Sequence, residues 1–238
     1  CANKRLRALT LIEVLVIVAV LVILAGLLIP SLNKAKRKSR TICCNCNLKQ
    51  VGLAYIMWAE KNEGLLPFQV DKAEGGTSNF VQTTFRFVPT NYKPWMTYVV
   101  MSNELGTPKI LRCPSSDSPD FKIEMFSDIS EGKSEYISYF VGGSASLTEP
   151  LSILSGDMNM SRGNDNNTEP STNLFSTTAA TTLVAKDMSA LSWGTQWHQG
   201  AGNIGLADGS VQGGTIPSLR KAFLATTNTA STMYLNFF

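Results

Sequence analysis

Residues 9–30 read LTLIEVLVIVAVLVILAGLLIP, and this stretch decides the architecture of the chain. The segment is apolar up to Ile29 except for Thr10 and one acid, Glu13, which lies near its start. A helix of this length and composition crosses the hydrocarbon core of a bilayer. A carboxylate at the centre of such a helix costs roughly 2.5–3.5 kcal/mol on insertion scales. Glu13 is therefore a candidate functional residue.

The start of this stretch carries a second pattern. A short basic leader, residues 1–8, ends at Ala8, and Glu13 is the fifth residue counted from Leu9. This arrangement resembles the N-terminus of type IV pilins and of the pseudopilins of type II secretion. The resemblance implies cleavage between Ala8 and Leu9, although that family usually has Gly and Phe at these two positions. Pro30 falls where the family often has a helix-kinking proline.

The resemblance also implies partners and a function. A prepilin peptidase would cut before Leu9 and methylate the new amine, and an assembly ATPase with its membrane platform would move the subunit into a filament. Self-assembly would then bring Glu13 to the amine of a neighbour's Leu9. The implied protein is a structural subunit and not an enzyme, either a type II secretion pseudopilin or a surface pilin. It would cross the inner membrane once, with its head in the periplasm and its filament periplasmic or at the cell surface.

Two simpler interpretations of the start remain open. Glu13 would act only within its own helix if it stabilised the helix start through the helix dipole. It would also act locally if it paired with the amine of Leu9 one turn away. An ordinary secretory signal peptide is a weaker match, because its apolar region is shorter and a small-residue cleavage site follows it.

The charge of the chain excludes one class of partner. The formal net charge is only +3, so binding to nucleic acid has no electrostatic support. The basic residues are uneven, with a cluster just after the apolar stretch that comprises Lys34, Lys36, Arg37, Lys38 and Arg40. By the positive-inside rule alone this cluster would keep the head in the cytoplasm. The resemblance implies the opposite orientation, in which the cluster meets lipid phosphates or acidic residues of neighbouring subunits.

The segment after Pro30 predicts that the helix continues as an amphipathic one. Apolar residues recur at steps of three and four on one face, at Cys44, Leu48, Val51, Tyr55 and Trp58. Gly64 then predicts the end of the helix. The alternative is two helices separated at Pro30. The expected organisation is a leader at 1–8, a transmembrane and polymerisation helix at 9–30, its amphipathic continuation at 31–63 and an exported globular head at 64–238.

The remaining sequence predicts an α+β, pilin-like fold, in which the long helix packs on a head with an antiparallel sheet. Predicted strands are Tyr136–Val141, Ser152–Gly156, Thr182–Lys186, Asn203–Ala207 and Ser210–Gln212, with polar loops at 71–79 and 162–172. Asp208-Gly209 suits a two-residue type I′ turn between the last two strands. A short helix is expected from Ile216 to Leu224.

Two of the cysteines are candidates for a disulfide. Cys44 lies on the apolar face of the amphipathic segment, whereas Cys43 and Cys46 lie to either side of it. A disulfide from Cys44 to Cys113 would tie the helix to the head, and two buried free thiols are the alternative. Cys43-Cys44-x-Cys46 lacks the usual zinc spacing, so no metal site is expected there.

The resemblance extends beyond the first helix to a large pseudopilin-like family. Segments that carry it are Asn47-Leu48-Lys49-Gln50, Arg112-Cys113-Pro114-Ser115, Ser138-Tyr139-Phe140-Val141-Gly142, and a C-terminal pattern of His198, nine residues, then Asp208-Gly209. His198 is the only histidine, and it would be a general base or a metal ligand if Asp208 or Asp187 were its partner. The simpler interpretation is that His198 hydrogen-bonds near the hairpin and orients Asp208.

Two further possibilities concern ligands. Asp157-Met158-Asn159-Met160-Ser161 begins like a calcium loop but lacks the later glycine and glutamate, so a solvated loop is expected. Because some pseudopilins bind calcium in the head, Asp157, Asp165, Asp187 and Asp208 are the candidate ligands; no other cofactor is expected. From a different class, the chain would be a membrane-tethered module that binds glycans or peptides without polymerising, if Trp193 and Trp197 were exposed.

Overall fold

The computed structural model describes residues 10–83, 91–116, 123–130, 137–162, 180–184, 191–195, 197–198, 200–227 and 232–237. The chain divides into two compact units, Cys1–Ser39 and Arg40–Phe238, and we call the second the head unit. Ala8, Leu9, Asp165 and Asp187 lie outside the described residues.

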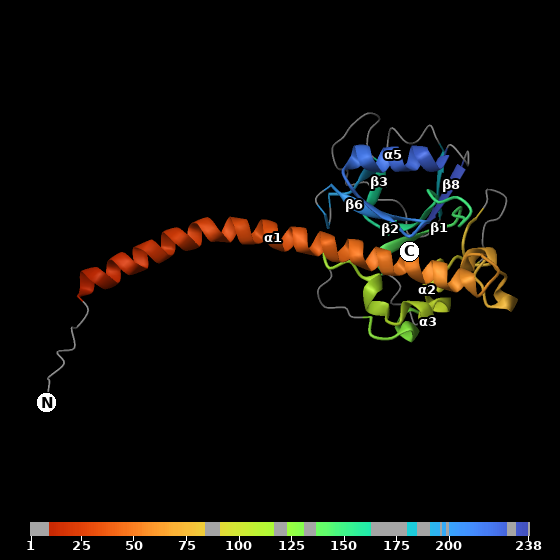
Figure 1. Ribbon diagram of the computed structural model, residues 1–238, viewed down its shortest axis with the longest axis horizontal. Helices are drawn as coiled ribbons and strands as arrows, with labels where there is room; N and C mark the ends of the chain where they lie inside the picture. The colour runs from red at the N-terminus through yellow and green to blue at the C-terminus, as the bar shows by residue number, and fades with distance from the viewer. Residues whose placement is uncertain are drawn as a thin grey trace. The chain divides into compact units, whose positions relative to one another are not determined.

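A single helix, α1, runs from Leu11 to Glu60 and passes through Pro30 without a break (Figure 1). The alternative of two separate helices is therefore wrong. α1 ends at Glu60, and the turn after it contains Gly64, which adopts a positive φ of 80° and donates its N–H to the carbonyl of Ala59. Glycine meets no steric penalty in that conformation, so the helix ends before Gly64, three residues short of the predicted bound at residue 63.

Short helical segments follow α1 in the sequence and precede the first strand. They are η1 (Pro67–Gln69), η2 (Lys72–Glu74), α2 (Met96–Val100), α3 (Ser102–Leu105), η3 (Pro108–Leu111) and α4 (Phe126–Asp128). Figure 1 shows α2 and α3 on the side of α1 that faces away from the sheet. A longer helix, α5 (Ile216–Thr227), lies near the C-terminus and has Pro217 in its first turn, where a missing N–H costs nothing. The predicted polar loop at 71–79 is only partly a surface loop, because Thr77 is fully buried and its hydroxyl lies 3.3 Å from that of Thr97.

The described strands form an antiparallel sheet of six strands in the order β4-β8-β1-β2-β6-β7, and β3 pairs separately with β5. The strands are β1 (Tyr139–Gly142), β2 (Ile153–Asp157), β3 (Met160–Arg162), β4 (Ala180–Val184), β5 (Leu191–Trp193), β6 (Gly202–Leu206), β7 (Val211–Gly214) and β8 (Thr232–Asn236). The long apolar helix and the antiparallel sheet confirm the expected α+β class.

The sheet of the head unit separates two apolar cores. Figure 1 shows α5 on one side of the sheet and the C-terminal half of α1 on the other. Consecutive residues of β1 point to opposite sides, so Tyr139 joins the core under α1 and Phe140 joins the core under α5. The predicted apolar face of α1 is confirmed, since all five of its residues from Cys44 to Trp58 are buried.

The turn between β6 and β7 differs from the prediction. A type I′ turn needs positive φ at two successive residues, but of Asp208 and Gly209 only Gly209 has one, at 78°. The N–H of Gly209 donates to the carbonyl of Leu206, and the N–H of Leu206 donates to the carbonyl of Ser210. These contacts describe a longer hairpin loop that ends in a left-handed glycine. Asp-Gly suits both loop types, which is why the sequence did not separate them.

Candidate functional site

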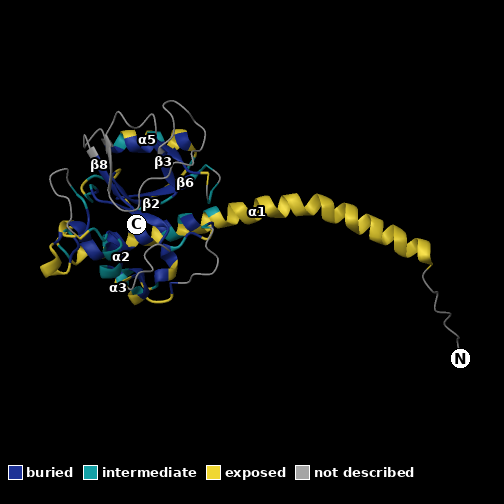
Figure 2. Ribbon diagram, turned by 180° about the vertical axis from the view of Figure 1, so that it is seen from behind, coloured by how far each residue is buried: buried dark blue, intermediate teal, exposed yellow. Residues whose placement is uncertain are grey.

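The N-terminal half of α1 exposes its apolar side chains on all sides. Large apolar residues from Leu11 to Leu32 keep between 48% and 85% of their surface exposed (Figure 2). Among the described residues, α1 is the one helix long and apolar enough to cross a membrane. Contact between such a surface and water is unfavourable, whereas contact with lipid or with other apolar helices is favourable.

Glu13 is held at the start of this helix by Thr10. The backbone N–H and the hydroxyl of Thr10 both donate to Oε2 of Glu13, at 2.7 and 2.8 Å. The N–H of Glu13 lies 3.4 Å from the Thr10 hydroxyl oxygen, which accepts from it. This reciprocal arrangement is a capping box, formed by threonine and a glutamate three residues later. The carboxylate therefore has a local structural role within its own chain.

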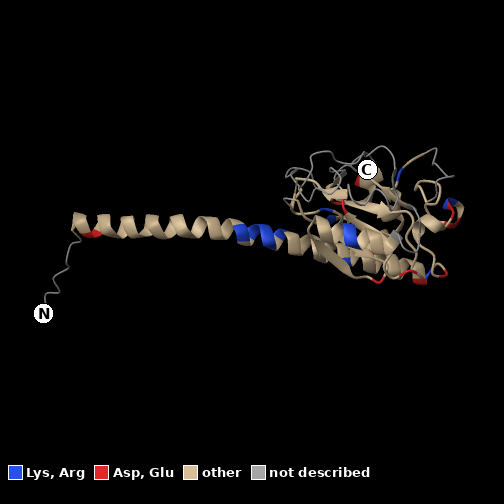
Figure 3. Ribbon diagram, turned by 90° about the horizontal axis from the view of Figure 1, so that it is seen from above, with Lys and Arg blue, Asp and Glu red and all other residues tan. Residues whose placement is uncertain are grey.

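A basic segment follows the apolar one on the same helix. Figure 3 shows it as a blue band on α1, and its five cationic residues are those between Lys34 and Arg40. Phosphate groups at a membrane surface attract such a segment, at about 1 kcal/mol for each Lys or Arg near the surface.

A disulfide joins α1 to the segment after η3. Cys44 and Cys113 are bonded, with their Cα atoms 5.2 Å apart, and both residues are fully buried. Cys43 and Cys46 are exposed free thiols on α1. Cys44 forms the disulfide because it lies on the buried face of α1, whereas Cys43 and Cys46 lie at exposed positions.

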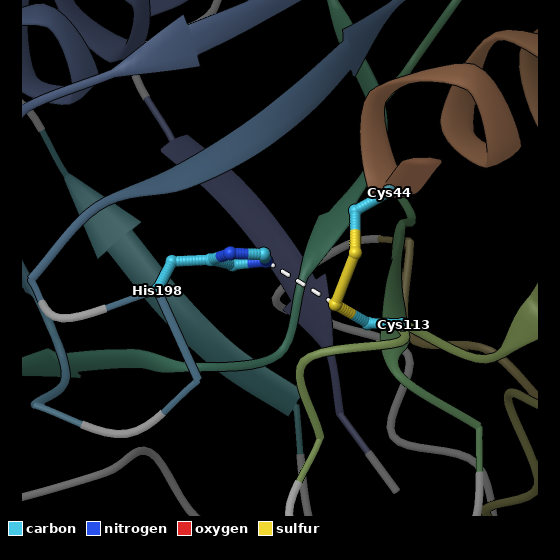
Figure 4. A group of neighbouring side chains, drawn as sticks. All are labelled: Cys44, Cys113 and His198. Carbon is cyan, nitrogen blue, oxygen red and sulfur yellow. Dashed lines mark hydrogen bonds between the residues drawn. A yellow bond between two sulfur atoms is a disulfide. The ribbon is translucent and has the colours of Figure 1, made fainter. Parts of the chain in front are cut away.

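His198 lies beside this disulfide (Figure 4). Its Nε2 is 3.2 Å from Sγ of Cys113, and its Nδ1 is 3.3 Å from the hydroxyl of Thr41. A disulfide sulfur carries no hydrogen, so Nε2 is the donor and Nδ1 accepts from Thr41. The side chain is only 1% exposed, and burial lowers the pKa of its imidazole. The preceding residue, Trp197, has a left-handed φ of 61°, a conformation uncommon for a bulky side chain.

The acid that His198 meets is Asp157, at the end of β2. Oδ2 of Asp157 lies 3.5 Å from Nε2 of His198 and accepts from the backbone and side-chain nitrogens of Asn203, at 2.7 and 2.9 Å. Oδ1 is buried and has no hydrogen-bond partner. Burial raises the pKa of Asp157 to about 7, and the bonds from Asn203 oppose that rise. The predicted solvated loop at 157–161 is wrong, because both Asp157 and Asn159 are buried.

The predicted partners of His198 need correction. The Oδ1 atom of Asp208 accepts from the N–H of Ser210, at the exposed hairpin turn, so the contact expected with His198 is replaced by that of Asp157. No spacing in the sequence indicates that Asp157 contacts His198, because strand pairing in the sheet brings these two residues together. Thr41 was also missed, although it precedes Cys44 by three residues and so lies on the same helical face.

The C-terminal pattern positions the β6–β7 hairpin on α1. His198 contacts Thr41 at one end. A side chain built at Gly205 would lie 3.9 Å from the carbonyl oxygen of Leu48, and one built at Gly52 would lie 3.7 Å from Cα of Gly209. The histidine, a strand glycine and the turn glycine thus lie along the same helix, beside Thr41, Leu48 and Gly52. This packing, and not a contact between His198 and Asp208, explains why the two ends of the pattern belong together.

The tryptophans do not form an exposed binding surface. Trp193 is 1% exposed and packs in the core under α5, and Trp197 is partly buried against the other core. Aromatic residues that stack on glycans need an open face, which Trp193 lacks.

Comparisons with protein-family models, with curated proteins and with solved structures found no match to this chain.

Proposed function

We propose that this chain is a structural subunit of a type II secretion pseudopilus or a related type IV pilus-like filament. It is made as a single-pass inner-membrane protein with its head in the periplasm, cut between Ala8 and Leu9, and then assembled with copies of itself. The observation that carries the proposal is the N-terminal half of α1, whose large apolar side chains are all exposed. Its motivation at the residue level is the resemblance of residues 1–30 to prepilin N-termini.

The proposed mechanism is a transfer of one surface between two apolar surroundings. In the membrane, lipid covers the side chains from Leu11 to Leu32. In the filament, the same side chains pack on those of neighbouring helices, so little apolar surface meets water in either state. Glu13 reaches the amine of a neighbour's Leu9, and this contact fixes the axial position of the subunit. In low dielectric such a pair is favourable only when both partners are present.

The capping box sets a limit on that mechanism. Thr10 already satisfies Oε2 of Glu13 within one chain. A neighbour's amine must therefore use the other carboxylate oxygen or replace the contact with Thr10. Glu13 therefore has a capping role that needs no neighbour, whereas the exposed apolar surface of α1 needs lipid or other helices to cover it.

Mass spectrometry of the native N-terminus tests the maturation step, with electron microscopy of sheared filaments as the second measurement. We expect a methylated Leu9 as the first residue, and filaments that contain the chain. A chain that keeps residues 1–8 and stays monomeric in the membrane would overturn the proposal. Glycan or peptide binding by that uncut monomer would instead support the membrane-tethered binding module.

A further inference from the structure

The disulfide site contains more potential metal ligands than a disulfide requires. Sγ of Cys44, Sγ of Cys113 and a ring nitrogen of His198 all lie within 4.8 Å of one another. Figure 4 shows the imidazole directed at the two sulfurs. Both cysteines are fully buried and the histidine side chain is 1% exposed, so side chains rather than water surround the group.

A buried carboxylate lies beside the same histidine. Asp157 is fully buried, and its Oδ2 lies 3.5 Å from the same Nε2 of His198 that faces Cys113. Its Oδ1 has no hydrogen-bond partner. A buried carboxylate oxygen without a donor is costly unless a proton or a cation satisfies it.

We propose that the reduced form of this site binds one zinc ion through Cys44, Cys113 and His198, with Asp157 in the fourth position. Two thiolates, one imidazole and one carboxylate make a donor set that suits zinc, since soft sulfur ligands select against calcium and magnesium. The inference does not depend on filament assembly. The same side chains then serve two exclusive states, a disulfide or a metal centre.

Reduction followed by metal binding converts the disulfide state into the metal state. A dithiol reductant breaks the Sγ–Sγ bond by giving two electrons and becomes a disulfide itself, and each protein sulfur takes one proton. Zinc then displaces those two protons and binds the thiolates. At about 2.3 Å from a tetrahedral ion, two sulfurs stand about 3.8 Å apart. Cα atoms 5.2 Å apart allow this separation through rotation of the cysteine side chains.

His198 can change from hydrogen-bond donor to ligand without moving far. In the disulfide state Nε2 carries the ring proton and Nδ1 accepts from Thr41. In the metal state Nε2 donates its lone pair to zinc, and the proton on Nδ1 is donated to the Thr41 hydroxyl oxygen. A hydroxyl serves in both directions, and such a partner orients a metal-binding imidazole.

Cobalt spectroscopy of the full chain in detergent tests the proposal. The background variant carries Cys1→Ser, Cys43→Ser and Cys46→Ser, so that Cys44 and Cys113 are its only cysteines. After reduction with a water-soluble phosphine, we expect added Co²⁺ to give a thiolate charge-transfer band and the intense visible bands of tetrahedral cobalt. These bands should saturate at one ion per chain, disappear when Zn²⁺ is added, and be absent without reduction. A reduced chain that gives no charge-transfer band would overturn the proposal.

Three substitutions in that background assign the other ligands. We expect His198→Gln to weaken cobalt binding at least about 10–100-fold and to shift the visible bands, and Asp157→Asn to weaken it about tenfold. Asp208→Asn, at an exposed turn, is the matched control and should change nothing. Unchanged affinity and spectrum in His198→Gln would remove that residue from the site.

A measurement on the unmodified chain covers the case in which a variant does not fold. After reduction, bound Zn²⁺ should slow alkylation of Cys44 and Cys113 by at least tenfold, as counted by peptide mass spectrometry. The exposed Cys43 and Cys46 serve as internal references and should react at the same rate with and without zinc. Alkylation of Cys44 and Cys113 at the same rate with and without zinc would contradict the proposal.

Discussion

Asp157 and His198 are two buried titratable groups that face each other under the sheet. Burial moves their pKa values in opposite directions, up for the acid and down for the imidazole. Both shifts favour the neutral forms, since a charged group loses its hydration in the core. Asn203 gives the carboxylate two hydrogen bonds that partly compensate for this loss. Because burial raises the pKa of Asp157 in the folded state, the free energy of unfolding depends on pH.

The first prediction concerns that pH dependence in the disulfide form. The folded pKa of Asp157 is about 7, above its usual value of 3.8, so the folded state holds the proton more tightly than the unfolded state. Its stabilisation is therefore complete below about pH 4 and is lost as the pH rises through about 7. His198 acts in the opposite direction, because its lowered pKa favours folding at high pH.

The test is the melting temperature of the oxidised chain between pH 4 and pH 8. In Asp157→Asn, which keeps an acceptor for Asn203, the fall in melting temperature assigned to this acid should disappear. Asp208→Asn, an exposed control, should keep the wild-type profile. A profile of Asp157→Asn that coincides with that of the wild type would contradict the assignment.

Between elements, α1 and the β6–β7 hairpin lie close together at two glycines, Gly52 and Gly209. A methyl group at Gly52 would lie 3.7 Å from Cα of Gly209, an ordinary contact. Gly209 itself has φ 78°, and a methyl group there would lie 3.4 Å from Cδ1 of Ile56. The two positions therefore respond differently to the same substitution.

Chemical denaturation measures how alanine at each position changes the free energy of unfolding. Gly52→Ala should raise the free energy of unfolding by up to about 1 kcal/mol, because alanine favours the helix. Gly209→Ala should lower it by about 1–2 kcal/mol, the cost of a left-handed conformation with a side chain. Gly75→Ala is the matched control, since Gly75 is also left-handed, with a φ of 89°, and no atom lies near its added methyl group. A smaller loss in Gly209→Ala than in Gly75→Ala would show that the turn does not pack as described.

The disulfide is the covalent link between α1 and the rest of the head unit. Cys44 and Cys113 are separated by 69 positions in the sequence, so the bond restricts a long loop of the unfolded chain. The double variant Cys44→Ala/Cys113→Ala should lose about 4 kcal/mol of unfolding free energy. The pair of exposed residues gives the control, and Cys43→Ala/Cys46→Ala should stay within about 0.5 kcal/mol of the wild type. An equal loss in both double variants would rule out a special role for the buried bond.

The sequence predicted the elements that depend on local pattern. Steps of three and four placed Cys44 on the buried face of α1, and Gly64 marked the end of the helix. Contacts made by sheet pairing were not predictable in this way. Asp157 reaches His198 because β2 pairs with β6, and no local signal records that pairing. Asp208-Gly209 was located correctly as a turn, but its type was wrong because the same dipeptide serves several hairpin loops.

At the scale of the whole molecule, the two compact units differ in what they need. The head unit buries two apolar cores around its sheet. The unit Cys1–Ser39 has no such core among its described residues, and its apolar side chains stay exposed. Such a surface is more stable in contact with lipid or with other apolar helices than in water. The proposed filament meets that need, and the contribution of Glu13 to it can be separated from its role as a cap.

Two substitutions at Glu13 separate these roles. Glu13→Gln keeps an oxygen that accepts from the Thr10 N–H, so the capping box persists while the charge is lost. Glu13→Ala removes both. If the acid pairs with a neighbour's amine, both variants should reduce filament yield at least about tenfold, since one unpaired buried charge costs several kcal/mol.

Yield is measured by quantitative immunoblotting of sheared filaments, with equal chain levels in the membrane fraction. Glu74→Gln, an exposed acid of the head unit, is the control. Normal assembly of Glu13→Gln beside impaired assembly of Glu13→Ala would leave the acid with its capping role alone.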